Sequence, residues 1–299
     1  MQSSISRQGK EGFRIPVADG RQVRRGNAKM RLEAKLTAKM VLIAMAALLT
    51  AEAAAVGSSA AGEALAAGGR LPAGVAGAEL GRRQMTQDLD RVFIGARGHL
   101  VKLSRLGSVL AQDGPACDSE MAPRLGSPRF TIIGAADRAG DLYCASQPLT
   151  SPVGIADRPY FLRAIGSQRY AVGDFQIGKL SGIKALGMGY PTRGADGAVN
   201  GVVFSDMSVD WLDRHVGGKR PRGSLDVLVV DEHGTVLARA GKRRTSPGRN
   251  LGAKSLVRAM LANDRGIGAF RLAGLKVISA FDTVRPSGGA VHVAVSVRR

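Results

Sequence analysis

The chain has 299 residues, of which 44% are apolar and only 4% aromatic, so a folded core has to be built mainly from aliphatic side chains. Its 43 Lys and Arg against 24 Asp and Glu give a net charge of +19, a balance compatible with a nucleic acid or an anionic membrane as partner. The sequence has no G-x-S-x-G, H-E-x-x-H or Walker motif. We therefore expect a binding protein and not an enzyme, with no catalytic residues, no metal site and no cofactor.

The positive charge is concentrated at the N-terminus. Residues 1–39 contain ten Lys and Arg against Glu11, Asp19 and Glu33, a net of +7. The remaining arginines are scattered, and they form neither a Lys/Arg-rich helix nor an alternation of basic with aromatic residues. This distribution indicates a solvated basic surface. We expect no nucleic-acid partner, and a basic nucleic-acid-binding protein ranks last among the alternatives.

An apolar segment follows the basic block. Residues 40–51, MVLIAMAALLTA, fit the core of an export signal, and A-x-A patterns follow at 51–53 and 53–55. A basic segment ahead of an apolar run holds the N-terminus in the cytoplasm during export. Two alternatives stay open, a cleaved signal and a retained anchor, and a third is a buried Ala-rich helix of a cytosolic protein.

These features divide the first part of the chain. We interpret residues 1–39 as a basic cytoplasmic tail, or as an over-long start if translation begins at Met30, and residues 40–61 as a membrane anchor or signal segment. A helix is predicted over residues 85–110, because apolar residues recur there at steps of three and four. Its apolar positions are Leu89, Val92, Phe93, Ala96, Leu100, Leu103 and Leu106.

An internal repeat follows this helix. FTIIGAADRAGDLYCAS is a strand, a turn ending in Gly140 and a second strand, and DVLVVDEHGTVLARA repeats the design with a turn ending in Gly234. Asp137 and Asp231 open the two turns, where a carboxylate can accept bonds from the backbone ahead. Two hairpins of one design imply two similar modules, and the strands and helices between them predict a mostly antiparallel α+β fold.

Each module is predicted to contain five strands and one helix, and a Gly/Pro/basic linker over 214–223 separates the modules. The first is placed at 111–213 and the second at 224–299. The predicted strands are 130–136, 141–146, 170–177, 183–191 and 201–209, then 225–231, 235–240, 267–272, 275–283 and 290–297. The predicted helices are 157–166 and, near the middle of the second module, 252–263.

Residues 157–211 are the most informative stretch. Arg158, Tyr160 and Phe161 open a short helix, and a Gly-bounded strand, a strand ending at Tyr190, a Gly-rich turn and the run GVVFSDMSV follow. This order resembles the ligand-binding half of the double-Cache (PAS-like) sensor domains, which lie outside the membrane in bacterial histidine kinases, chemoreceptors and diguanylate cyclases. The resemblance extends over roughly residues 85–297.

The resemblance implies a function and a location. The helix at 85–110 would be a stalk helix along both modules and a possible homodimer contact, with the first module distal and the second proximal to the inner membrane. The chain would sense a small organic ligand in the periplasm, while any cyclase or kinase output lies outside it. The alternative is a periplasmic solute-binding protein released after signal cleavage.

The resemblance also bears on the two cysteines. Double-Cache domains linked to diguanylate cyclases often carry a Cys at the places of Cys117 and Cys144, which implies a disulfide between them. Export favours the same pairing, because disulfides persist in oxidising compartments. From the residues alone, two separate buried thiols remain an alternative.

The ligand-binding residues follow from the same resemblance. Amino-acid-binding relatives use an Arg-x-aromatic-aromatic run for the ligand carboxylate and an Asp in a later strand for its amine, and Arg158, Tyr160, Phe161 and Asp206 match those places. We expect a carboxylate or another small anion at Arg158, with an amino acid as the narrower alternative. Phe175 and Tyr190 complete the expected site. The alternatives are plain core packing of the aromatics, a solvent-facing Asp206, and a surface ion pair of Arg158 with Asp157 or Asp174.

Overall fold

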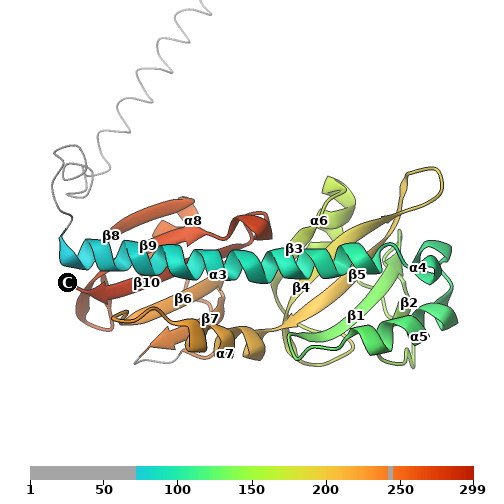
Figure 1. The fold of residues 1–299 in the computed structure, drawn as a ribbon, viewed down its shortest axis with the longest axis horizontal. Coiled ribbons are helices and arrows are strands. Elements are labelled where there is room, and N and C mark those ends of the chain that lie inside the picture. The colour runs from blue at the N-terminus through green and yellow to red at the C-terminus, as the bar shows by residue number, and fades with distance from the viewer. Residues whose placement is uncertain (1–71, 242–244) are drawn as a thin grey trace, which may run out of the picture. The chain divides into compact units, whose positions relative to one another are not determined.

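The computed structural model describes residues 72–241 and 245–299. The predicted tail 1–39 and apolar segment 40–61 lie outside these residues. None of the described helices combines the length and the apolar character needed to cross a membrane. The described residues form one long helix and two five-stranded antiparallel sheets (Figure 1). The predicted α+β class with two tandem modules is confirmed.

The two sheets have the same topology. In the first module the strand order is β2-β1-β5-β4-β3, and in the second it is β7-β6-β10-β9-β8, which is the same order shifted by five strands. The first sheet consists of β1 (Phe130–Asp137), β2 (Leu142–Ala145), β3 (Ala171–Ile177), β4 (Lys184–Arg193) and β5 (Val199–Ser208). The second consists of β6 (Asp226–Asp231), β7 (Val236–Gly241), β8 (Arg265–Leu272), β9 (Leu275–Thr283) and β10 (Val291–Arg298).

The repeated hairpin turns have one geometry. The carboxylate of Asp137 accepts a bond from the backbone N–H of Asp141 at 3.0 Å, and that of Asp231 accepts the equivalent bond from the N–H of Thr235 at 2.8 Å. Gly140 has φ +93° and Gly234 has φ +77°, values that a side chain disfavours. The Asp and Gly of each turn therefore fix the hairpin that starts each module.

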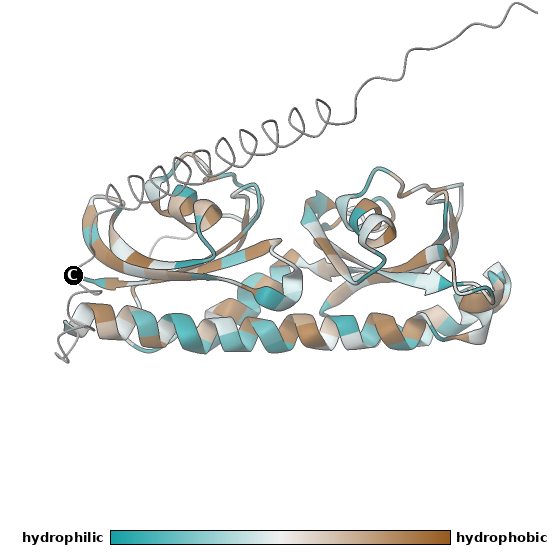
Figure 2. Cartoon of the chain, turned by 90° about the horizontal axis from the view of Figure 1, so that it is seen from above, coloured by the Kyte–Doolittle hydropathy of each residue, from teal (hydrophilic) through white to brown (hydrophobic). Residues whose placement is uncertain are grey.

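Each sheet has a short helix on one face. α6 (Pro159–Ser167) covers the first sheet through a core that includes Ile132, Tyr160 and Phe204, and α8 (Ser255–Ala262) covers the second through Leu256 and Met260. In Figure 2 both short helices lie on the side of the sheets opposite to the long helix.

The long helix α3 (Ala73–Leu103) contacts both sheets on their other face. One continuous core contains its apolar side chains together with residues of both modules. The buried α3 residues in this core are Met85, Leu89, Val92, Phe93, Ala96, Leu100 and Leu103. The periodicity that predicted the helix thus marks the stripe that faces the sheets.

The bounds of α3 differ from the predicted 85–110. The helix begins at Ala73, because a Gly/Ala-rich first part packs closely on the second sheet: a Cβ at Gly81 would lie 2.8 Å from Val295. It ends at Leu103, since Leu106 has an extended backbone and a separate helix, α4 (Gly107–Ala111), follows. Apolar periodicity alone does not predict the end of the helix at Leu103, because Leu106 still fits the apolar pattern.

The predicted linker at 214–223 is largely helical. α7 (Val209–Lys219) continues directly from β5, and the Ser208 hydroxyl caps it by accepting a bond from the N–H of Trp211 at 3.1 Å. Leu212 and Val216, one turn apart, are both buried. The cap and this apolar face outweigh the low helix propensity of the Gly217–Gly218 pair, from which a linker was predicted.

Cys117 and Cys144 form a disulfide, as the resemblance implied, with their Cα atoms 5.8 Å apart. Cys117 lies on α5 (Gly114–Arg124) and Cys144 on strand β2, and both side chains are fully buried. The bond therefore fastens the α4–α5 segment to the edge of the first sheet.

Removing this bond should destabilise the chain. For a sequence separation of 27 between the cysteines, the chain-entropy treatment gives about 3–4 kcal/mol. We expect the C117A/C144A double variant to unfold at a correspondingly lower urea concentration. The reductant-treated wild type serves as a second measurement, and an unchanged urea midpoint in both would contradict a stabilising role for the bond.

Candidate functional site

A small cavity lies between α6 and the first sheet. Three of the residues expected to bind ligand, Arg158, Tyr160 and Asp206, line it together. Its other lining residues are Ile132, Leu142, Val153, Ile155, Gln176, Lys179, Leu180 and Phe204. The cavity thus combines mostly apolar walls with a few polar groups, which is the usual composition of a small-molecule site.

Arg158 is placed by the start of α6. It is the N-cap residue, with an extended backbone, and Pro159 follows at the first helical position, where its missing N–H costs nothing. The guanidinium Nη2 of Arg158 donates to the carbonyl oxygen of Ile177 on β3 at 3.1 Å. This bond uses one of the five guanidinium donors, so the side chain keeps others for a ligand.

Tyr160 is held by glycines of two strands. A Cβ at Gly187 would lie 2.3 Å from its ring, and Cβ atoms at Gly173 and Gly189 would lie within 3.2 Å of Tyr160 atoms. The ring therefore rests directly on the backbone of β3 and β4, and it is only 1% exposed. Glycine is needed at these three positions because a side chain at Gly187 would collide with Tyr160 and one at Gly173 or Gly189 would crowd it.

Asp206 lies inside the protein. It is 3% exposed, and in the sheet it is paired with Ile132 on β1 and Gly187 on β4. Burial raises the pKa of its carboxyl from 3.8 to about 6, against the opposing effects of the Arg158 charge and of the bond from Gln176. The alternative of a solvent-facing Asp206 is excluded by this burial.

Gln176 is a polar cavity residue that sequence reasoning missed. Its Nε2 donates to the Asp206 carboxylate at 2.9 Å, while its buried Oε1 has no hydrogen-bond partner among the described residues. A buried acceptor without a partner is costly, so Oε1 is an acceptor available to a ligand. The sequence feature that could have identified Gln176 is its polar side chain within a predicted strand, most of whose residues turn out to be buried.

Lys179 was also missed, and it lies at the β3–β4 turn. Its ammonium donates to the carbonyl oxygen of Gly154 and to the carboxylate of Asp157, both at 2.7 Å. These bonds fasten the turn to the segment before α6, across the cavity that both line. The space inside the cavity is about 10 Å³, which is room for one water, so a larger ligand requires the lining to move apart.

The other three expected residues lie outside the cavity lining. Phe161 is buried in the core beneath α6, and Tyr190 lines a different cleft between the two modules. Phe175 points to the second module, where a Cβ at Gly248 would lie 2.8 Å from its ring. Alternation along β3 sends neighbouring side chains to opposite faces, so Gln176 and not Phe175 faces the cavity.

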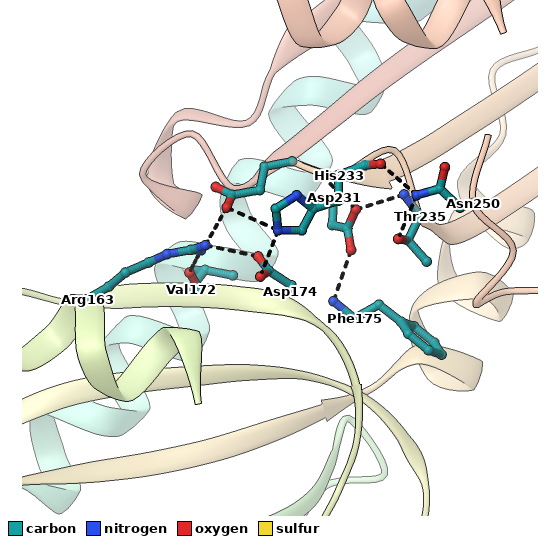
Figure 3. A network of polar contacts seen from close by, with 9 residues as sticks. Arg163, Val172, Asp174, Phe175, Asp231, His233, Thr235 and Asn250 are labelled. Atoms are coloured by element: carbon teal, nitrogen blue, oxygen red, sulfur yellow. Dashed lines mark hydrogen bonds and ion pairs between the residues drawn. The ribbon is translucent and has the colours of Figure 1, made fainter. Parts of the chain in front are cut away.

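The two modules meet through a polar network (Figure 3). Arg163 on α6 donates to the carbonyl oxygen of Val172 at 2.7 Å and forms ion pairs with Asp174 and with Glu232 of the β6–β7 turn. Next to them, the N–H of Phe175 donates to the Asp231 carboxylate at 3.1 Å. The helix that bears Arg158 and Tyr160 is therefore directly bonded to the second module.

The same network contains a group of metal-ligand types. Donor atoms of Asp174, Glu232 and His233 lie within 4.8 Å of one another. The guanidinium of Arg163 forms an ion pair with both carboxylates, and His233 Nε2 lies 3.2 Å from the Asp174 carboxylate. We therefore interpret these residues as an ion-pair network that joins the modules.

Gly187 offers a test of how Tyr160 is held. In the variant G187A the new Cβ would collide with the ring, and we expect a loss of about 1–3 kcal/mol in unfolding free energy, measured in urea. G166A is the matched control, because a Cβ there meets no atom within 4 Å and alanine favours the helix. Equal stability of the two variants would contradict this packing.

Asp206 should lower the stability of the unliganded protein at neutral pH. Its pKa is higher in the folded than in the unfolded chain, so the stability falls as the pH rises from about 4 to 6 and the carboxyl ionises. At ~1.4 kcal/mol per pKa unit, the variant D206N should be more stable than the wild type by about 3 kcal/mol at pH 7 and equal near pH 3.5. Urea unfolding at the two pH values measures this, and a less stable D206N at pH 7 would contradict the assignment.

We compared the chain with known protein families, sequences and structures, and only the solved structures gave matches. No family model and no curated protein sequence matches the chain. Many solved structures are similar, among them the following three, each matched over 74% of this chain. The extracellular domain assigned to a histidine kinase, rpHK1S-Z16, has a TM-score of 0.61 with 17% identity and 94% of its length covered.

The two others are ligand-binding domains. The ligand-binding domain of the Pseudomonas fluorescens chemoreceptor CtaA, in complex with L-isoleucine, has a TM-score of 0.58, with 16% identity and 90% coverage. The ligand-binding domain of Mlp24 with asparagine has a TM-score of 0.54, with 13% identity and 92% coverage. The chain therefore has the fold of the extracellular ligand-binding domains of bacterial sensor kinases and chemoreceptors, as the double-Cache resemblance implied.

Proposed function

We propose that the chain is an extracytoplasmic sensing domain of a bacterial signal-transduction protein, and that its first module binds a small molecule carrying a carboxylate and an amine. The observation that carries the proposal is the cavity in which a guanidinium and a buried carboxylate share mostly apolar walls. Amino acids fit this arrangement of charges, and two of the similar structures hold isoleucine and asparagine.

Each polar residue of the cavity would contact a different part of the ligand. Arg158 would hold the ligand carboxylate, since a planar guanidinium binds carboxylates through two parallel bonds. Asp206 and the unpartnered Oε1 of Gln176 would accept bonds from the ligand amine. Tyr160 and Phe204, whose ring centroids lie 6.1 Å apart, supply apolar and aromatic surface.

A bound amine would also lower the free energy of the buried, ionised Asp206 carboxylate. The burial that raises the pKa of this carboxyl disfavours its charge, and an adjacent ammonium favours it. Binding should therefore weaken below about pH 6, as Asp206 takes up a proton. This dependence distinguishes a ligand with an amine from a plain carboxylate.

Signalling in this proposal is a shift between two states of the first module. Opening of the Lys179 contacts admits the ligand, and closure around it repositions α6. Arg163 on the same helix bonds to Glu232 of the second module, which would pass the change on. The segment 40–61 would attach this sensor to the inner membrane.

The test is a binding screen of the protein against amino acids, organic acids and amines by thermal shift, followed by calorimetry. A ligand at 100 times its Kd should raise the stability by about 2.7 kcal/mol. For the variant R158A we expect affinity to fall by about 10- to 100-fold, since a charged hydrogen bond contributes about 1.5–3 kcal/mol.

The control variant R124A removes an exposed guanidinium from the same module, outside the cavity. Its affinity should equal that of the wild type. Equal affinity of R158A and the wild type for the ligand found would refute the assigned site. Tighter binding of plain organic acids than of amino acids would refute the role given to Asp206.

A further inference from the structure

A second cavity lies where the two modules meet, and it is far larger than the first. Its volume is about 540 Å³, within the range of roughly 300–1,000 Å³ typical of ligand sites. α3, the α6–β3 region, β4, the β6–β7 turn and the η1 turn (Arg285–Ser287) all contribute to its lining. Residues of both modules thus surround one space.

The charged groups that line this cleft are mostly cationic. Four arginines face one carboxylate, that of Glu232, which forms an ion pair with Arg163. The other three arginines, Arg97, Arg169 and Arg285, form no ion pair or side-chain hydrogen bond within residues 72–241 and 245–299. All three are exposed, and the charge of Arg285 also acts on the carboxyl of Asp90. Three guanidinium groups around one concave space attract a multiply charged anion.

The remaining lining is mixed: Ser167, Gln168 and Ser287 add polar groups, and two tyrosines add aromatic surface. Tyr170 is fixed by the bond from its hydroxyl to the sulfur of Met188 at 3.1 Å, and Tyr190 is half-buried. Val172 and Pro286 add apolar contacts. An inorganic ion would leave most of this volume and surface unused, whereas a carbon skeleton bearing several carboxylates would use both.

We propose that this cleft, which we call the junction cleft, binds an organic di- or tricarboxylate through Arg97, Arg169 and Arg285. Guanidinium groups bind carboxylates in planar, bidentate pairs, so three of them match up to three carboxylates. Arg169 belongs to the first module and Arg285 to the second. The bound anion therefore bridges the modules beside the Arg163–Glu232 ion pair and reinforces their contact.

The test is calorimetric titration of the whole protein with citrate and with inorganic phosphate, each at low and high salt. We expect one citrate per chain, with weaker binding of phosphate. The double variant R169A/R285A should lose at least tenfold in citrate affinity. R271A is the matched control, because Arg271 is an exposed arginine of β8 outside the cleft lining, and its affinity should be unchanged.

The variant R158A separates this site from the first one. Citrate should bind to it as to the wild type, whether or not the first module binds an amino acid. Absence of citrate binding to the wild type would overturn the proposal, as would an equal loss in R271A and R169A/R285A, which would indicate unspecific charge attraction. Phosphate binding as tight as citrate binding would overturn the assignment to a polycarboxylate.

Discussion

The fold depends on the burial of one stripe of α3 by two sheets at once. A five-stranded sheet with one short helix leaves its second face apolar, and each module meets this requirement with the same long helix. Because the core is continuous along α3, neither module keeps its full core without the helix. A displacement of α3 would be felt in both modules, which is a physical basis for communication within one chain.

Much of this architecture could be predicted from the sequence, because it follows from local patterns. The spacing of Leu89, Phe93 and Leu100 predicted the helix, and the paired Asp–Gly turns predicted the duplication that the equal strand orders confirm. The start of α3 and the helical nature of 209–219 could not be predicted in the same way. Both depend on tertiary contacts, such as the packing of Gly81 on Val295, that override the low propensity of glycine.

The candidate site was predictable in part for the same reason. Arg158, Tyr160 and Asp206 stand out by residue type, and they line one cavity. The roles of Gln176 and Phe175 depend on which face of β3 each residue occupies, and a bulge after Val172 alters that alternation. Lys179 lies in the β3–β4 turn, and its place at the cavity depends on contacts with the segment before α6. The junction cleft is formed by segments far apart in sequence, so no local sequence pattern predicts that its three arginines lie close together.

The contacts of Lys179 have a consequence for timing. A cavity with room for a single water has to widen before the proposed ligand can enter, and separation of the β3–β4 turn from the segment before α6 is one movement that would widen it. In the proposed sensor, a slow opening of these contacts would limit how quickly the domain responds to a rise in ligand concentration. Substitution of Lys179 would then change the response time of the sensor.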